Sequence, residues 1–192
     1  MLRSCALAVV VVGAMAGAQA QDRGPLGVVF DGMARTGSDT RPVRFRFFCS
    51  PNSGPNVTGV LAVELEIPHY EQLRRVFDFE PFEGPDAHAG PLTTLLADGA
   101  RRAGDHFTAA GSVVASGGSE AFMLGIDASR RDPGPLHKLS FVLHPLTEGR
   151  AQLTWLQGNP KPGGVTMTAT LDLGQARSEQ LKSGLGPCLG AR

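Results

Sequence analysis

The chain has 192 residues with 18 basic and 18 acidic side chains, so its formal net charge at pH 7 is zero. This balance argues against a nucleic-acid partner and against an anionic membrane surface, because both favour a basic protein surface. The length fits one domain with a sizeable core, and the strong preference for arginine over lysine is typical of GC-rich bacterial genomes.

Residues 1–20 have the features of a cleaved signal peptide. Arg3 supplies a positive charge, an apolar run extends from Cys5 to Val12, and Ala18-Gln-Ala20 offers small residues to a signal peptidase. The apolar run is too short for a comfortable membrane span, and no later stretch approaches that length. We therefore expect export to the periplasm or the cell exterior, with no membrane span in the mature chain.

The segment that follows, residues 21–42, is rich in Gly, Ser, Thr and Asp. These residues favour loops, so the segment is predicted to be a flexible leader with a short edge strand at 28–30. Residues 43–192 are predicted to form a single globular domain.

Two early strands carry the clearest pattern in the chain. Apolar and polar residues alternate over 43–49 and again over 61–67, which is typical of half-buried strands. Turn-forming residues separate the two runs and predict an antiparallel pair. On the exposed outer face of this strand pair, basic side chains of the first strand would lie across from acidic side chains of the second. The four residues predicted to be exposed there are Arg44, Arg46, Glu64 and Glu66.

Later elements follow the same reasoning. Helical spacing is found at 69–77, 136–143 and 174–183, and the second of these has Leu136, Leu139, Val142 and Leu143 on one face. Residues 92–96 are ambiguous, and 98–105 are predicted to be a polar loop. Further strands are predicted at 107–115, 120–128, 153–155 and 165–171, the first two being joined by a glycine turn at 116–119.

The order of these elements predicts an α+β domain, with two or three short helices on one face of a mainly antiparallel sheet. The predicted order strand–helix–strand–strand occurs twice, beginning at 61 and at 122, as an internal duplication would produce. The alternative is that two amphipathic helices arose independently after strands. A β-sandwich is the alternative if the short helices are loops. The residues predicted to fill the core are Phe45, Val63, Leu65, Phe122, Leu124, Leu153, Trp155 and Met167.

Of the three cysteines, Cys5 would leave with the signal peptide, so Cys49 and Cys188 remain as one pair. In an oxidising compartment such a pair predicts a disulfide. Two separate buried thiols are the alternative.

An acidic and aromatic segment at 78–88 is the best candidate for a partner contact. Its carboxylates and its histidine match no established calcium or zinc spacing, so neither a metal nor a cofactor is predicted. One phenylalanine would serve as an aromatic anchor within an acidic rim. Alternatively, both rings point into the core and the segment is only a connector. The residues expected to contact a partner are Phe79, Glu80, Phe82, Glu83, Asp86 and His88.

His137 and His144 lie seven residues apart and would share a helix face, but Lys138 and Pro145 favour a solvated end. The sequence contains neither G-x-S-x-G nor H-E-x-x-H. The missing catalytic signature favours a non-catalytic exported binding protein for an unknown protein or small ligand. A small secreted hydrolase with a site assembled from separate loops and a structural envelope protein are the alternatives.

Overall fold

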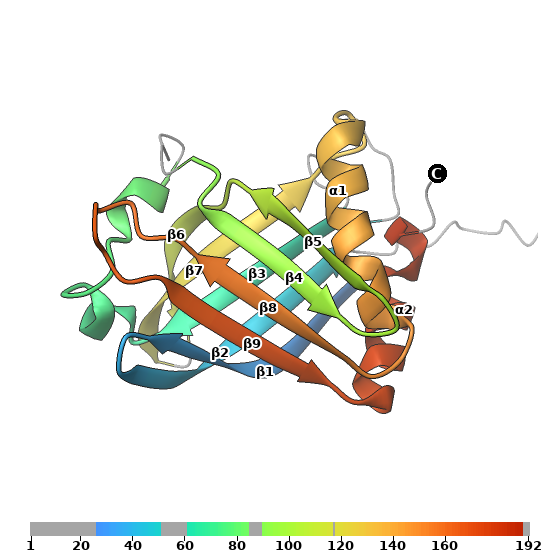
Figure 1. Cartoon of the computed structure of the whole chain (residues 1–192), viewed down its shortest axis with the longest axis horizontal. Helices are drawn as coiled ribbons and strands as arrows, with labels where there is room; N and C mark the ends of the chain where they lie inside the picture. The colour runs from blue at the N-terminus through green and yellow to red at the C-terminus, as the bar shows by residue number, and fades with distance from the viewer. Residues whose placement is uncertain (1–25, 51–60, 85–89, 117, 190–192) are drawn as a thin grey trace, which may run out of the picture.

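A computed structural model describes residues 26–50, 61–84, 90–116 and 118–189. Its main feature is one nine-stranded antiparallel sheet, curled into a half-barrel, with the order β5-β4-β8-β9-β1-β2-β3-β7-β6 (Figure 1). The strands are β1 Leu26–Thr36, β2 Asp39–Cys49, β3 Leu61–Pro68, β4 Thr93–Asp98, β5 Arg102–Phe107, β6 Ala110–Ser116, β7 Ser119–Ala128, β8 Ala151–Gln157 and β9 Met167–Leu173.

Two α-helices, α1 Pro133–Leu143 and α2 Gln175–Leu189, lie at one end of the curled sheet (Figure 1). α1 contacts β4 and β5 near one edge of the sheet and β3 and β7 near the other, so it lies between the two halves of the curl. The 3-10 helices η1 Tyr70–Leu73 and η2 Glu80–Phe82 lie at the opposite end, and η3 His144–Thr147 follows α1.

The inner face of the sheet carries the hydrophobic core. All eight residues predicted to fill it are fully buried, which confirms the strand faces. The apolar face predicted for the second helix is also confirmed, because Leu136, Leu139, Val142 and Leu143 of α1 are buried. The core therefore follows from period-two strands combined with one amphipathic helix.

Cys49 and Cys188 form a disulfide with a Cα–Cα distance of 5.8 Å, as predicted. The bond joins the last residue of β2 to the last turn of α2, and both cysteines are buried. It therefore fixes α2 against the central strands.

The predicted α+β class is wrong, because the chain forms one curled β-sheet with only two α-helices among the described residues. Residues 69–77 form no α-helix: His69 has a left-handed φ of 53°, and only a 3-10 turn follows it. So short a segment gains too few hydrogen bonds to offset helix nucleation. Because the strands belong to a single sheet, the β-sandwich alternative is wrong as well.

The predicted duplication is not supported by the structure. β3 is followed by 3-10 turns, whereas β7 is followed by the eleven-residue helix α1. The polar loop predicted at 98–105 also fails, because β5 begins at Arg102.

The expectation of a flexible leader over 21–42 is wrong for its described part. β1 occupies Leu26–Thr36 in the middle of the sheet and pairs with β2 along its whole length. Gly32 suggested a loop, but a Cβ there would lie 2.6 Å from the Thr170 carbonyl oxygen and 2.7 Å from the Phe45 ring. The glycine is required by close packing within a strand. The signal peptide predicted at 1–20 lies outside the described residues.

Loss of the disulfide is expected to destabilise the protein without changing its fold. Cys188→Ser opens a loop of 139 residues, so chain entropy predicts a loss of up to about 5 kcal/mol in the free energy of unfolding. Urea unfolding of protein produced under oxidising conditions measures this loss, and mass analysis under non-reducing conditions should find no free thiol at Cys49 in the wild type. Two alkylatable cysteines in the unreduced chain would contradict the bond.

Candidate functional site

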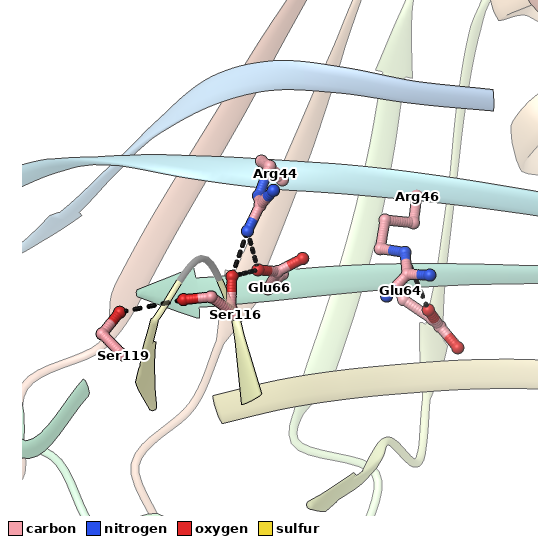
Figure 2. Close-up of polar contacts among 6 residues, drawn as sticks. All are labelled: Arg44, Arg46, Glu64, Glu66, Ser116 and Ser119. Carbon is pink, nitrogen blue, oxygen red and sulfur yellow. Dashed lines mark hydrogen bonds and ion pairs between the residues drawn. The ribbon is translucent and has the colours of Figure 1, made fainter. Parts of the chain in front are cut away.

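A strip of paired charges crosses the outer face of β2 and β3. Arg44 lies opposite Glu66 and Arg46 opposite Glu64, so the predicted register is confirmed. Both arginines form ion pairs with the carboxylates they face (Figure 2). The strip is thus neutral overall, because each cation has its own anion.

Glu66 was predicted to be exposed, and this prediction is wrong: its side chain is only 6% exposed. The β6–β7 hairpin brings Ser116 against it, and the Ser116 hydroxyl donates a hydrogen bond to Glu66 Oε1 (Figure 2). Arg44 Nη2 donates to the same carboxylate oxygen and also to Ser116 Oγ. A buried carboxylate needs such donors to offset its desolvation.

The neighbouring pair is more open. Arg46 Nε lies 3.7 Å from Glu64 Oε2, and its guanidinium sits 5.2 Å from the centre of the Phe48 ring. Burial raises the pKa of Glu64, and the nearby Arg46 opposes this rise only in part. Exposed pairs of this kind contribute little to stability.

The Arg44–Glu66–Ser116 cluster resembles a catalytic arrangement, because a serine hydroxyl faces a carboxylate. Its hydrogen bonds are nevertheless better explained by a structural role. A nucleophilic serine needs a base that is free to take its proton. The Glu66 carboxylate is instead only 6% exposed, and its Oε1 already accepts hydrogen bonds from Arg44 and from Ser116. The cluster fastens the end of the β6–β7 hairpin to β2 and β3.

The acidic and aromatic segment is anchored in the core. Phe79 and Phe82 are buried, and the Phe79 ring packs against Tyr70 and Phe122 at 5.3 Å and 4.8 Å between ring centres. The rings are therefore core residues, as in the connector alternative. Glu80 and Glu83 are exposed, whereas Asp86 and His88 lie outside the described residues. Partner contact through the acidic side chains stays a prediction.

A groove along α1 brings together residues that the sequence kept apart. His137, Ser140 and Phe141 lie along the outward side of α1, and His144 follows them at the start of η3. Arg101 enters from the β4–β5 turn and Leu189 from the end of α2, giving a groove of about 480 Å³. Its remaining lining comes from Pro133 and Leu136.

The groove combines an apolar surface with cationic and titratable groups. Phe141 is 45% exposed although it is large and apolar, and the Arg101 guanidinium lies 5.9 Å from its ring centre. Arg101 Nε is 3.9 Å from a Glu148 oxygen, a long ion pair between partly exposed side chains. His144 Nδ1 lies 3.1 Å from the other Glu148 oxygen. Such a surface suits a ligand with an apolar body and an anionic end.

The sequence contained part of this site. The seven-residue spacing of His137 and His144 predicted a shared helix face, and both residues line the groove. The expectation of a merely solvated end missed Arg101 and Leu189, which are distant in sequence and reach the groove only through the tertiary fold.

Within the described ranges, no three His, Cys, Asp or Glu side chains gather in a way that could hold a metal ion. In the same part of the chain, no helix has the length and apolar character needed to cross a membrane.

The fold defines the chain as a curled antiparallel half-barrel with two helices at one end, bound to its centre by a disulfide. No protein-family model, curated protein or solved structure matches it.

Removing Arg44 should destabilise the fold more than removing Arg46. Arg44→Ala leaves the buried Glu66 carboxylate without its cation, so we expect a loss of about 1.5–3 kcal/mol in the free energy of unfolding. Arg46→Ala is the matched control on the same strand, with an expected loss below about 1 kcal/mol because Glu64 is more exposed. Urea unfolding compares the two variants, and equal losses would contradict a supporting role for the buried cluster.

Tyr70 offers a second test, because it is the only tyrosine in the chain. Burial, together with the neighbouring Glu71, raises the pKa of Tyr70 to about 12. Tyrosinate absorbance of the folded protein should therefore rise with a midpoint near pH 12, compared with about 10 for the protein unfolded in urea. The same shift predicts a stability that is intact below pH 10 and falls between pH 10 and 12. A midpoint near 10 in the folded protein would show that the ring is accessible.

Proposed function

We propose that this protein is an exported, non-catalytic binding protein that holds a small amphipathic carboxylate in the groove along α1. The observation that carries the proposal is the exposed Phe141 ring beside Arg101 and two histidines in one groove. Large exposed apolar side chains near convergent polar groups are typical of ligand sites.

The charges around the groove favour an anionic ligand group. Arg101 is held by Glu148 only across 3.9 Å, and both side chains are partly exposed. A ligand carboxylate can accept two hydrogen bonds from a guanidinium, which is a stronger interaction than this long pair.

The apolar part of the ligand would lie against the remaining lining. Phe141 and Leu189 provide exposed or half-buried apolar surface, and Leu136 lies beneath them at 9% exposure. Burying a flexible hydrocarbon or an aromatic ring there removes apolar surface from water on both sides. A carboxylic acid with a medium-length hydrocarbon chain would contact both the apolar lining and the Arg101 guanidinium.

The proposed compartment is the periplasm or the cell exterior. The Cys49–Cys188 disulfide is compatible with an exported protein, because such bonds persist in oxidising compartments. The signal-like residues 1–20 support the same location. The hydrolase alternative has less support, since Ser116 faces a carboxylate that is already paired with Arg44.

Calorimetric titration with decanoate tests the proposal. Decanoate should bind the mature protein, and Phe141→Ala and Arg101→Met should each weaken binding about tenfold, equivalent to about 1.4 kcal/mol. Met33→Ala and Arg35→Met are matched controls, because Met33 is as exposed as Phe141 and both controls lie on β1, away from the groove. They should leave binding unchanged.

Decanol provides the matching ligand control, because it keeps the chain and lacks the carboxylate. Its binding should depend on Phe141 and not on Arg101. Equal affinities of the groove variants and the β1 variants, or no binding of decanoate at all, would contradict the proposed site.

A further inference from the structure

Gln157 places a primary amide inside an otherwise apolar core. It is the last residue of β8, its side chain is fully buried, and it lies opposite Thr93 of β4 and Met167 of β9. The β8 arrow points away from α1 and α2 (Figure 1), and Gln157 is not among the residues that line the groove along α1.

The orientation of this amide is fixed by two donors. Gln157 Oε1 accepts a hydrogen bond from Trp155 Nε1 at 3.0 Å and another from Thr93 Oγ1 at 2.8 Å. An indole N–H can only donate, so the atom facing Trp155 must be the amide oxygen. If the amide oxygen and nitrogen were exchanged, the amide NH2 would face the indole N–H, and both groups are donors. This excludes the flipped orientation of the amide.

The amide nitrogen then points the other way with no acceptor. Gln157 Nε2 has no hydrogen-bond partner in the described structure and is shielded from bulk solvent. Leaving a buried donor unsatisfied costs the full desolvation of that group. The amide oxygen alone would suffice to accept the hydrogen bonds from Trp155 and Thr93. The buried NH2 group of the same side chain therefore calls for an acceptor beside Nε2.

We infer that Gln157 Nε2 donates to a single ordered water molecule inside the half-barrel. Water is the acceptor of smallest size, and buried waters in proteins typically satisfy polar groups that would otherwise have no partner. Thr93 Oγ1 keeps lone pairs after donating to Gln157, so it is able to accept a hydrogen from the same water. The water would complete a polar network formed by Thr93, Trp155 and Gln157.

This inference is independent of the proposed ligand, because Gln157 and the groove share no residues. A water molecule held here would exchange slowly with the solvent. The nuclear Overhauser effect between this water and nearby protein hydrogens would therefore have the sign that is typical of a long residence time.

The experiment is water–protein cross-relaxation on the ¹⁵N-labelled mature protein without added ligand. The Gln157 side-chain amide should show a contact with long-lived water. Gln152 is the matched control on the same strand, since its amide is exposed and donates to Asp172 at 2.8 Å. Its amide should show only rapidly exchanging water.

Oxygen-17 relaxation dispersion provides a count of long-lived waters. Gln157→Met, which fills a similar shape without polar atoms, should lower this count by one, and Gln152→Met should leave it unchanged. A crystal structure of the wild type at atomic resolution should show an oxygen about 2.7–3.2 Å from Nε2. This result does not depend on the folding of any variant. Nε2 in contact with protein atoms only, or a Gln157 amide without a contact to long-lived water, would overturn the inference.

Discussion

The pairing of β1 with β2 is the constraint on which the rest of the sheet depends. β1 pairs with β2 over all eleven of its residues, but with β9 only from Met33 to Thr36. Within the described sheet, the strands β5, β4, β8 and β9 are thus hydrogen-bonded to β2, β3, β7 and β6 only by way of β1. Gly32 permits the close approach of Thr170 and Phe45 at the place where β9 meets β1, so a side chain at that position would disturb both halves.

The same hairpin shows why part of the fold could not be predicted from sequence. β3, β7, β8 and β9 alternate apolar and polar residues because one face is buried, and this pattern is visible without a structure. In β1 the alternation is interrupted at Gly32 and followed by the turn glycine Gly37, whose φ is 62°. A glycine required by tertiary packing has the same appearance in sequence as a loop glycine, so local pattern favoured a flexible segment.

The candidate sites likewise combine features that could be predicted from the sequence with features that could not. Cross-strand charges could be predicted because strand register alone places Arg44 opposite Glu66. The burial of Glu66 could not, since it depends on Ser116 from a hairpin fifty residues away. Likewise, the spacing of His137 and His144 follows from helix geometry, whereas the arrival of Arg101 beside Phe141 depends on how α1 packs against the sheet. The combinations of side chains at both candidate sites arise from tertiary contacts that no local sequence pattern encodes.

The position of the disulfide has a mechanical consequence. It links the end of β2 to the end of α2, so the chain from Cys49 to Cys188, which lie 139 positions apart, forms a covalently closed ring. Tension applied ahead of β1 and behind α2 would run through the first hairpin, cross the sulfur–sulfur bond and leave through Leu189. The seven strands from β3 to β9 and helix α1 would carry none of this load directly. Under traction the molecule would thus extend by shearing β1 and β2 from their neighbours, and the closed ring would not lengthen beyond the disulfide.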